Sequence, residues 1–475
     1  MTSLSETSLL AGSSGVVSGY KIDQSIRFNS ADNPSLSKTF SGAGTEETWT
    51  FSCWFKRGGA KEETRNMIFS AGSAGNTFGG LELGHGAGTS YGRSPLIFYN
   101  YTSGSYNWRL QTSMSFGDFS AWYHVVVVCD TTNAVETDRA RIYVNGVRQT
   151  SFNSSISAPS FPSLNFSGNH WMGTTEHDIG TSIFTTQNFD GYLAEIHNID
   201  GSAYGPEYFG EFKEDVGIWI PKEYEGSYGT NGFYIDGRDS SDLGDDESGR
   251  GNDFTASNLA ANDKRADSPT NNHVTFNPVA PYIDGATMTF KNGSLDVTNT
   301  SSAWGSSQTT IGIPGSGKWT FAFKLTNSLG GSSYPMFGII DSRNQTQTDG
   351  VSLPYQSGTP ANSMVYVNTY QDSSQAYFFK GGNGSESTIG SAFAHGGATN
   401  GEWQWFVNSD DEELTVYHNG TVRLDAYDIS FLTFPVFIAA TMYDYDDLRL
   451  LNEPGTEYTP SISGYKAINT TNIGS

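Results

Sequence analysis

Apolar and polar side chains alternate along most of this chain, and this period of two constrains its fold more than any other feature. In residues 49–55, alternate positions place Trp49, Phe51, Cys53 and Phe55 on one face of an extended strand. Residues 123–129 form a continuous apolar run with four valines, which favours a central strand because valine is a poor helix former. Residues 141–147 contain Asn145-Gly146, a dipeptide typical of two-residue hairpins. The pattern therefore predicts an all-β protein built from antiparallel sheets.

The second half of the chain repeats this plan. Residues 319–325 share the alternation of residues 49–55, and residues 414–420 end in Asn419-Gly420. Two β-sandwiches in tandem explain the repetition better than one large sheet. The stretch 236–267 is acidic, rich in glycine and poor in large apolar residues, which is typical of a long loop or linker. We therefore expect an N-terminal arm at 1–20, a sandwich at 21–210, an acidic Gly-rich connector at 211–282 and a second sandwich at 283–475.

The charge balance argues against several classes of partner. The chain has 50 acidic and 26 basic residues, a net charge of −24, and no cluster of lysine or arginine. Such a field repels phosphate backbones and anionic lipids, so we expect neither nucleic-acid binding nor membrane insertion. No apolar run approaches the roughly 18 residues of a membrane span, and residues 1–20 do not have the pattern of a secretory signal. We expect a soluble protein made in a cytoplasm.

Each half of the chain resembles a known family of sandwiches. The first half resembles the concanavalin A-like, laminin-G-like jelly-roll family, whose order and spacing are followed by residues 49–55, 122–127, 142–146 and 189–196. The second half resembles a SPRY-type sandwich, through residues 317–321, 414–420, 434–437 and 458–465. These resemblances imply two antiparallel β-sandwiches, a jelly roll followed by a SPRY-like domain.

The segment that joins the halves resembles a different group of proteins. Residues 231–236, the loop 239–254 and residues 268–272 are similar to a segment recurrent in structural proteins of marine tailed bacteriophages. That resemblance implies a virion component, associated with the tail or the capsid surface and made in the host cytoplasm. Virion fibres and spikes are symmetric, so we also expect a homo-oligomer, with a trimer as the first choice.

The jelly-roll class includes glycoside hydrolases, which bring two carboxylates together on one face. The nearest candidate lies in residues 195–200, where Glu195 and His197 share a face of the strand but Asp200 falls on the opposite one. No Gly-x-Ser-x-Gly elbow occurs in a strand-to-helix context. Cys53 and Cys129 are expected to be buried thiols, and they can pair only if their strands are neighbours. We therefore expect no catalytic residues and no enzyme activity.

Two acidic clusters contain the oxygen ligands that Ca²⁺ prefers. One comprises Asp239, Asp242, Asp245 and Asp246, and the other spans residues 443–447. Neither follows the order of an EF-hand, and charge runs usually serve solubility. Solvated acidic loops are the preferred interpretation. Ca²⁺ is the only metal that the clusters suggest, and no other cofactor is expected.

Aromatic residues interleaved with Asn, Ser and Gly are typical of adaptable binding surfaces. Residues 91–109 and 443–447 have this composition, and Trp54 faces away from the core residues of its own strand. The candidate ligand-binding residues are Trp54, Tyr91, Tyr99, Tyr101, Tyr106, Trp108, Tyr443 and Tyr445. The alternative for each is ordinary packing of a ring against a loop.

Together these features predict a virion protein that binds a host-surface glycan or protein during adsorption. Its partners would be other virion proteins and that host ligand. Two alternatives stay open: a decoration or assembly protein with no host ligand, and a glycan depolymerase.

Overall fold

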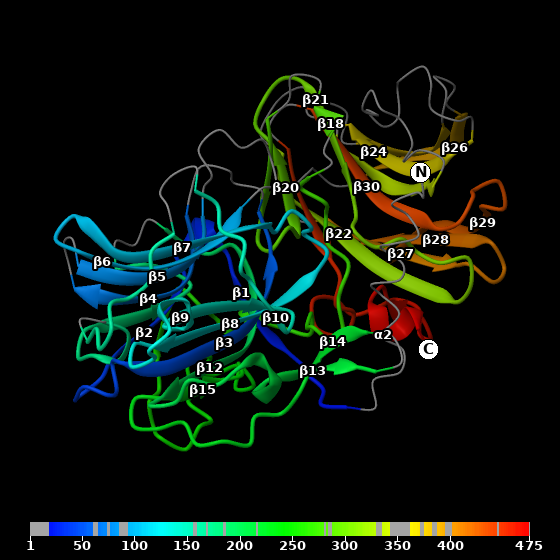
Figure 1. Cartoon of the computed structure of the whole chain (residues 1–475). Coiled ribbons are helices and arrows are strands. Elements are labelled where there is room, and N and C mark those ends of the chain that lie inside the picture. The colour runs from blue at the N-terminus through cyan, green and yellow to red at the C-terminus, as the bar shows by residue number, and fades with distance from the viewer. Residues whose placement is uncertain are drawn as a thin grey trace. The chain divides into compact units, whose positions relative to one another are not determined.

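The computed structural model describes residues 19–59, 65–73, 77–84, 94–154, 159–167, 170–183, 187–214, 217–279, 282–283, 287–328, 335–342, 362–370, 375–381, 387–394, 401–443 and 446–474. The chain divides into two compact units, of which the first is Val17–Asn271 and the second contains Asn272–Ser475. Almost all regular structure in both is antiparallel β-sheet, which confirms the predicted all-β class (Figure 1). Within the described residues, no helix is long and apolar enough to span a membrane.

The first unit is a sandwich of two sheets with its core between them (Figure 1). The first sheet has the order β10-β9-β8-β3-β12-β1-β17, and β15 also pairs with β12. Its strands are β1 (Ser25–Phe28), β3 (Thr48–Arg57), β8 (Trp122–Asp130), β9 (Ala140–Val144), β10 (Val147–Arg148), β12 (Gly191–Asp200), β15 (Phe233–Ile235) and β17 (Lys264–Arg265). The second sheet has the order β16-β2-β11-β4-β5-β6-β7. Its strands are β2 (Ser35–Thr39), β4 (Asn66–Ser73), β5 (Thr77–Leu83), β6 (Pro95–Thr102), β7 (Ser105–Ser115), β11 (Glu176–Ile179) and β16 (Thr255–Ser257).

The alternating side chains of β3 fill this core as the sequence predicts. Phe51 stacks on Phe69 of the opposite sheet, with 4.6 Å between the ring centroids. Cys53 is fully buried in the same row of β3, and Cys129 is buried on β8 opposite Trp49. Neither cysteine forms a disulfide, and burial raises the pKa of each thiol.

The segment expected to be a connector, 211–282, is folded onto the first unit as far as Asn271. Within it β15 pairs with β12, β16 with β2 and β17 with β1, while β13 (Gly210–Lys213) forms a hairpin with β14 (Ile218–Pro221). Phe233, Ile235 and Phe254 are buried in the core of the first unit. The boundary between the two units along the chain therefore falls after Asn271. The average composition of this stretch is that of a loop, but a few of its apolar side chains are buried and hold it against the sheet. The stabilisation comes from the side chains that are buried, so the average composition of the segment does not predict it.

The second unit is also a sandwich of two antiparallel sheets, except that β32 pairs in parallel with β22. One sheet has the order β18-β21-β30-β23-β24-β25-β26, and the other has the order β19-β20-β31-β22-β27-β28-β29. The strands of the former are β18 (Tyr282–Ile283), β21 (Trp304–Gln308), β23 (Met336–Asp341), β24 (Met364–Tyr370), β25 (Gln375–Gly381), β26 (Ser387–Ala394) and β30 (Val436–Tyr443). The latter contains β19 (Met288–Lys291), β20 (Asp296–Asn299), β22 (Lys318–Ser328), β27 (Glu402–Asn408), β28 (Glu413–His418), β29 (Thr421–Asp428), β31 (Asp446–Leu451) and β32 (Lys466–Ala467), and a short helix, α2 (Thr470–Ile473), follows.

Both predicted Asn-Gly turns close hairpins. Asn145 and Gly146 join β9 to β10 with φ angles of 46° and 78°. Asn419 and Gly420 join β28 to β29 with φ angles of 49° and 73°. Positive φ at both turn positions is the requirement of a type I′ turn, which explains why this dipeptide marks the hairpins.

Candidate ligand-binding face

Four aromatic side chains gather on the outer face of the second sheet, which is the face turned away from the core. Tyr106 lies 5.6 Å from Tyr99 and 5.1 Å from Tyr101 between ring centroids, edge to face in both pairs. Phe78 lies 5.4 Å from Tyr101. Tyr106 is 39% exposed, whereas Tyr99 is almost fully buried. We call Phe78, Tyr99, Tyr101 and Tyr106 the tyrosine cluster, and it brings together three residues that the sequence proposed for ligand contact.

A pair of glycines on β5 lets rings pack closely on both sides of the strand. A Cβ atom at Gly79 would lie 2.3 Å from the indole nitrogen of Trp171, which belongs to the core. A Cβ atom at Gly80 would lie 2.4 Å from the hydroxyl oxygen of Tyr99 on the outer face. Since neither approach leaves room for a side chain, the glycine pair sets the depth at which Tyr99 lies on the sheet.

A register shift between Asn100 and Tyr101 determines which side chains of β7 reach the outer face. Tyr106 pairs with Tyr101 and joins the tyrosine cluster. Trp108 pairs with Asn100 and lies in the core, where its ring is 4.6 Å from that of Phe98. Trp108 is fully buried there, so the structure separates it from the other predicted ligand-binding residues.

Three charged side chains border the tyrosine cluster: Arg65, Glu82 and Arg109. Arg65 Nε lies 3.5 Å from Glu82 Oε1, and the Tyr99 hydroxyl donates a hydrogen bond to Glu82 Oε2 at 3.4 Å. The Arg109 guanidinium lies 5.3 Å from the centroid of the Tyr106 ring. Burial raises the pKa of Glu82 to about 7, although Arg65 and Arg109 oppose the shift. This carboxyl group therefore changes its charge near neutral pH beside two cations.

These charged residues are not among those predicted from the sequence to contact a ligand. Glu82 stands between Leu81 and Leu83, which are both buried in the core. The alternation alone therefore predicts that Glu82 faces outward. No sequence pattern indicated that Arg65 and Arg109 would lie beside it, because these contacts depend on the order and register of the strands.

Trp54 lies on the face of β3 opposite the core, as predicted, but it is covered. Its indole lies 4.8 Å from the ring of His124, and Tyr20 and Trp219 pack against the same apolar cluster. Only 5% of Trp54 is exposed. The side chain is therefore part of the packing between the first sheet and the chain segments that cross its outer side.

The remaining predicted ligand-binding residues divide between the two units. Tyr91 and Tyr445 lie outside the described residues. Tyr443 is half-buried at the end of β30, with its ring 4.9 Å from that of Trp304 on the neighbouring strand. It therefore lies beside an apolar face of the second unit.

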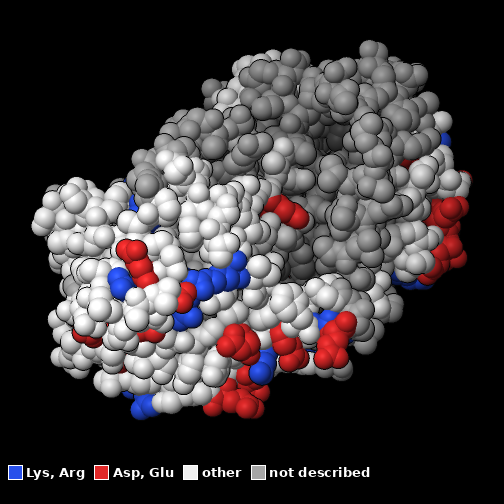
Figure 2. All heavy atoms as spheres, viewed as in Figure 1, with Lys and Arg blue, Asp and Glu red and all other residues white. Residues whose placement is uncertain are grey.

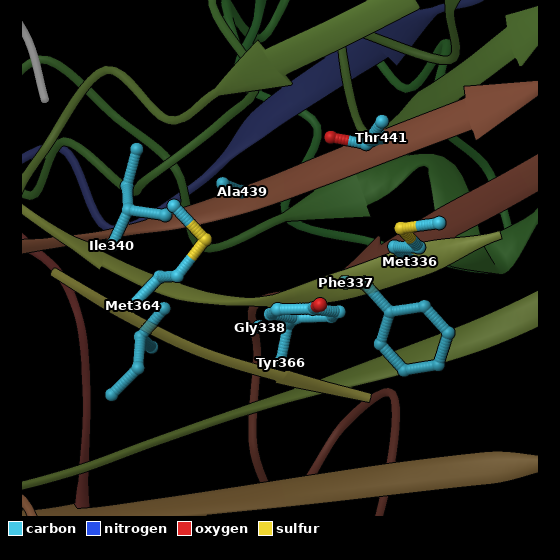
Figure 3. Close-up of a pocket in the computed structure, with 9 residues that line it drawn as sticks. Met336, Phe337, Gly338, Ile340, Met364, Tyr366, Ala439 and Thr441 are labelled. Atoms are coloured by element: carbon cyan, nitrogen blue, oxygen red, sulfur yellow. The ribbon is translucent and has the colours of Figure 1, made fainter. Parts of the chain in front are cut away.

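That apolar face contains a small hollow (Figure 3). Met336 and Ile340 of β23, Met364 and Tyr366 of β24 and Ala439 of β30 line it. Its interior volume is about 10 Å³, which is close to the space that one water molecule needs. The hollow is too small for a sugar ring, so the tyrosine cluster remains the better candidate for ligand binding.

A buried polar network covers the outer side of the first sheet around Glu195. A register shift between Ala194 and His197 leaves Glu195 with a φ of 50°. Glu195 accepts hydrogen bonds from Tyr234 at 2.7 Å and from Tyr20 at 2.9 Å, and His197 Nε2 lies 3.4 Å from it. Burial favours a higher pKa for Glu195, but the hydrogen bonds from His197, Tyr234 and Tyr20 outweigh it and lower the pKa.

The geometry around Glu195 does not resemble an acid–base pair. Asp200, the other acid on this strand, accepts hydrogen bonds from the backbone nitrogens of Thr45, Thr230 and Asn231. It thereby holds loops together. The crevice beside Glu195 and His197 has no interior volume, so it has no room for a water molecule.

A serine and a histidine also meet in this network. Ser52 Oγ lies 2.9 Å from His124 Nε2, and the Trp219 indole donates a hydrogen bond to His124 Nδ1 at 3.0 Å. Because an indole nitrogen can only donate, Nδ1 is the acceptor and Nε2 carries the proton of the neutral ring. Burial lowers the pKa of His124 to about 3. In this tautomer His124 donates to Ser52 and cannot take its proton, so the pair lacks the arrangement of a nucleophile and its base.

Three of the aspartates proposed for Ca²⁺, namely Asp239, Asp242 and Asp246, accept hydrogen bonds from the chain around them. Asp246 is buried and accepts hydrogen bonds from the backbone nitrogens of Tyr234, Ser248 and Asn252 and from the Ser248 hydroxyl. Asp239 accepts two from Ser241, and Asp242 accepts one from the nitrogen of Gly244. Among the described residues, no group of three or more His, Cys, Asp or Glu is placed to hold a metal ion. Part of the second acidic cluster, at 444–445, lies outside the described residues.

Charged side chains are interspersed on the face seen in Figure 2. Acidic and basic residues of the first unit lie next to one another there, without a continuous basic stripe among the atoms drawn in colour. A nucleic-acid-binding surface would show basic residues clustered on one face or along one groove.

Comparison with known proteins identifies the class of the first sandwich. Residues 27–201 match the model of the concanavalin A-like lectin/glucanase superfamily, Laminin_G_3. This range runs from β1 to the end of β12, so the match lies within the first unit and takes in most of its two sheets. No curated protein matches the sequence.

Solved structures with similar folds come from several sources. The SPRY domain of human HERC1 is 13% identical, covers 36% of this chain and 96% of its own, and has a TM-score of 0.26. The carbohydrate-binding module CBM66 from Bacillus subtilis is 13% identical, covers 36% and 92%, and has a TM-score of 0.25. Domains LG4-5 of the mouse laminin α1 chain are 8% identical, cover 95% and 88%, and have a TM-score of 0.28.

Proposed function

We propose that this chain is a non-catalytic binding protein whose tyrosine cluster holds a glycan. The observation that carries the proposal is the packing of Tyr99, Tyr101 and Tyr106 edge to face on an outer sheet face, with Tyr106 partly exposed. Aromatic rings of this kind present a flat apolar surface with a hydroxyl at its edge, which suits the apolar face and the hydroxyls of a sugar. Supporting it, the jelly-roll class to which the first unit belongs includes lectins.

We further propose a setting for this activity. The resemblance of residues 231–272 to a segment of phage structural proteins supports a role in a virion, on the tail or the capsid surface, during adsorption to a host. In that role the protein would be made in the host cytoplasm, assemble as a homo-oligomer, with a trimer expected first, and contact other virion proteins. It would need no cofactor, with Ca²⁺ as the one metal that its acidic clusters suggest, and would neither bind nucleic acid nor insert into a membrane, in keeping with its net charge of −24.

Glycan binding by the full chain tests the proposal. Tyr106→Ala removes the exposed ring, and we expect it to lower the affinity for any glycan that binds by about tenfold, which corresponds to ~1.4 kcal/mol. Tyr208→Ala is the matched control, because Tyr208 is a tyrosine of similar exposure, 42%, that packs on Tyr204 elsewhere in the first unit. If no glycan binds while the protein is still incorporated into particles, it is a decoration protein instead. Release of reducing ends from a host polysaccharide would make it a depolymerase.

A further inference from the structure

The charges around the tyrosine cluster differ in sign from those of the protein as a whole. Among the described residues, two cationic side chains, Arg65 and Arg109, and one acidic side chain, Glu82, border the cluster. With Glu82 ionised, their charges sum to +1. The whole chain carries −24. A positive spot in a protein this acidic requires an explanation, and the contacts of the two arginines supply one.

Arg109 is buried beneath the tyrosine cluster and is already engaged. Its Nη2 donates to Gln111 Oε1 at 2.6 Å, and its guanidinium faces the ring of Tyr106. Only 4% of the residue is exposed. Arg109 therefore supports the exposed ring from below and is not positioned to reach a ligand directly.

Arg65 has the opposite character. Its side chain is 39% exposed, and among the described residues it contacts Glu82, through Nε at the long distance of 3.5 Å, and the Tyr106 side chain. An arginine carries five N–H donors in a planar fork that matches carboxylate and sulfate groups. The described contacts of Arg65 therefore do not use all of the N–H donors of its guanidinium, which lies at the edge of the exposed Tyr106 ring.

Two further acids among the described residues of this face belong to another strand. Glu176 and Asp178 belong to β11, three strands from β6 in the order β11-β4-β5-β6. At a spacing of about 4.8 Å per strand, they are about 14 Å from Tyr99 and Tyr101. Since charges are screened over about 8 Å at physiological salt, these two acids contribute little to the field at Tyr99 and Tyr101.

We infer that the ligand of the tyrosine cluster is an acidic sugar, whose ring stacks on Tyr106 while its carboxylate or sulfate group meets Arg65. This inference rests on the proposed function and adds the chemical class of the ligand. The two groups lie side by side, because Arg65 contacts the Tyr106 side chain directly. One sugar unit can therefore engage both.

A glycan array tests the inference, with each acidic oligosaccharide printed beside its carboxyl-reduced or desulfated neutral counterpart. The full chain should bind acidic members at least tenfold more tightly than their neutral partners, and raised salt should reduce that difference. Arg65→Gln should abolish the preference, and Arg65→Lys should retain part of it. Arg148→Gln is the matched control, because Arg148 has a side chain of similar exposure, 36%, and pairs with Asp138 elsewhere.

The outcomes separate the inference from the function on which it rests. Equal, Tyr106-dependent binding of acidic and neutral partners would overturn the inference and leave glycan binding intact. Binding of neither member, with a melting temperature of the Arg65→Gln protein equal to that of the parent, would overturn both. An acidic preference that persists in Arg65→Gln would place the anion elsewhere and would likewise overturn the inference.

Discussion

Lys56 Nζ lies 2.8 Å from Asp267 Oδ2, and both side chains are buried, with exposures of 0% and 1%. Lys56 belongs to the central strand β3, whereas Asp267 lies at the end of the stretch whose composition suggested a connector. The Trp122 indole donates a hydrogen bond to the other carboxylate oxygen at 3.0 Å. This ion pair therefore fastens residues 211–271 to the middle of the first sandwich.

Breaking this pair from one side should destabilise the protein strongly. Asp267→Asn or Lys56→Met leaves a charge buried without its partner, and we expect a loss of about 3–5 kcal/mol in the free energy of unfolding of the first unit. The double variant Lys56→Met/Asp267→Leu should recover most of that loss, since it leaves no buried charge. Urea denaturation measures all three. A loss below about 1 kcal/mol in the single variants would show that the pair is not buried in solution.

The boundary between the units can be tested by truncation. A fragment of residues 19–271 should unfold in one cooperative transition, because it retains β15, β16, β17 and Asp267. A fragment of residues 19–210 should fail to fold, since it loses Phe233, Ile235 and Phe254 from the core and removes Asp267 from Lys56. Circular dichroism during heating distinguishes the two. Equal melting of both fragments would mean that the segment is a connector after all.

Asp178 should make stability depend on pH. It is buried on β11, makes no hydrogen bond through its side chain among the described residues, and has a pKa raised to about 7 by burial and by Glu176. The folded state therefore holds its proton more tightly than the unfolded chain, so this contribution to stability is present at low pH and is lost as pH rises through about 7. Asp178→Asn should raise the free energy of unfolding by about 1–2 kcal/mol at pH 8 and change it little at pH 4. Equal effects at both pH values would contradict the assignment.

Glu82 should make binding of an acidic sugar depend on pH. An anionic ligand near Arg65 and Arg109 favours the protonated form of Glu82, whose pKa is about 7 before binding. Affinity should therefore rise as pH falls from 8 to 6, while a sugar carboxylate stays ionised. Glu82→Gln should bind nearly equally at both pH values. Calorimetric titration with an acidic oligosaccharide measures this, and a neutral oligosaccharide is the control.

Removal of divalent cations should leave the first unit unchanged. The carboxylate of Asp246 already accepts three hydrogen bonds from its own loop and one from Tyr234 of β15, which a calcium ion would have to displace. We expect the melting temperature to stay the same within about 1 °C when EDTA replaces Ca²⁺, because a ligand that does not bind the native state cannot stabilise it. Asp246→Ala should lower it in both conditions. A lower melting temperature in EDTA alone would restore the Ca²⁺ hypothesis.

Several local features could be predicted from the sequence because they depend on near neighbours. The alternation in residues 49–55 places Phe51 and Cys53 in the core, and both Asn-Gly pairs form the predicted turns. The same alternation places Glu195 and His197 on one side of β12, although a register shift intervenes between Ala194 and His197. These outcomes follow from strand geometry and turn conformations, which a few consecutive residues determine.

The sequence by itself determined a pair of β-sandwiches, with aromatic residues along the strands that became β6 and β7. Only the tertiary structure decided which of these aromatic residues contact one another. A shift of one residue between β6 and β7 sends Trp108 to the core and Tyr106 to the outer face, since side chains alternate with a period of two. Likewise, the pairing of Asp267 with Lys56 joins residues far apart in the chain, and that of Arg65 with Glu82 depends on the register between β4 and β5. Such contacts depend on the order and the register of the strands. The residue type at a single position determines neither of these.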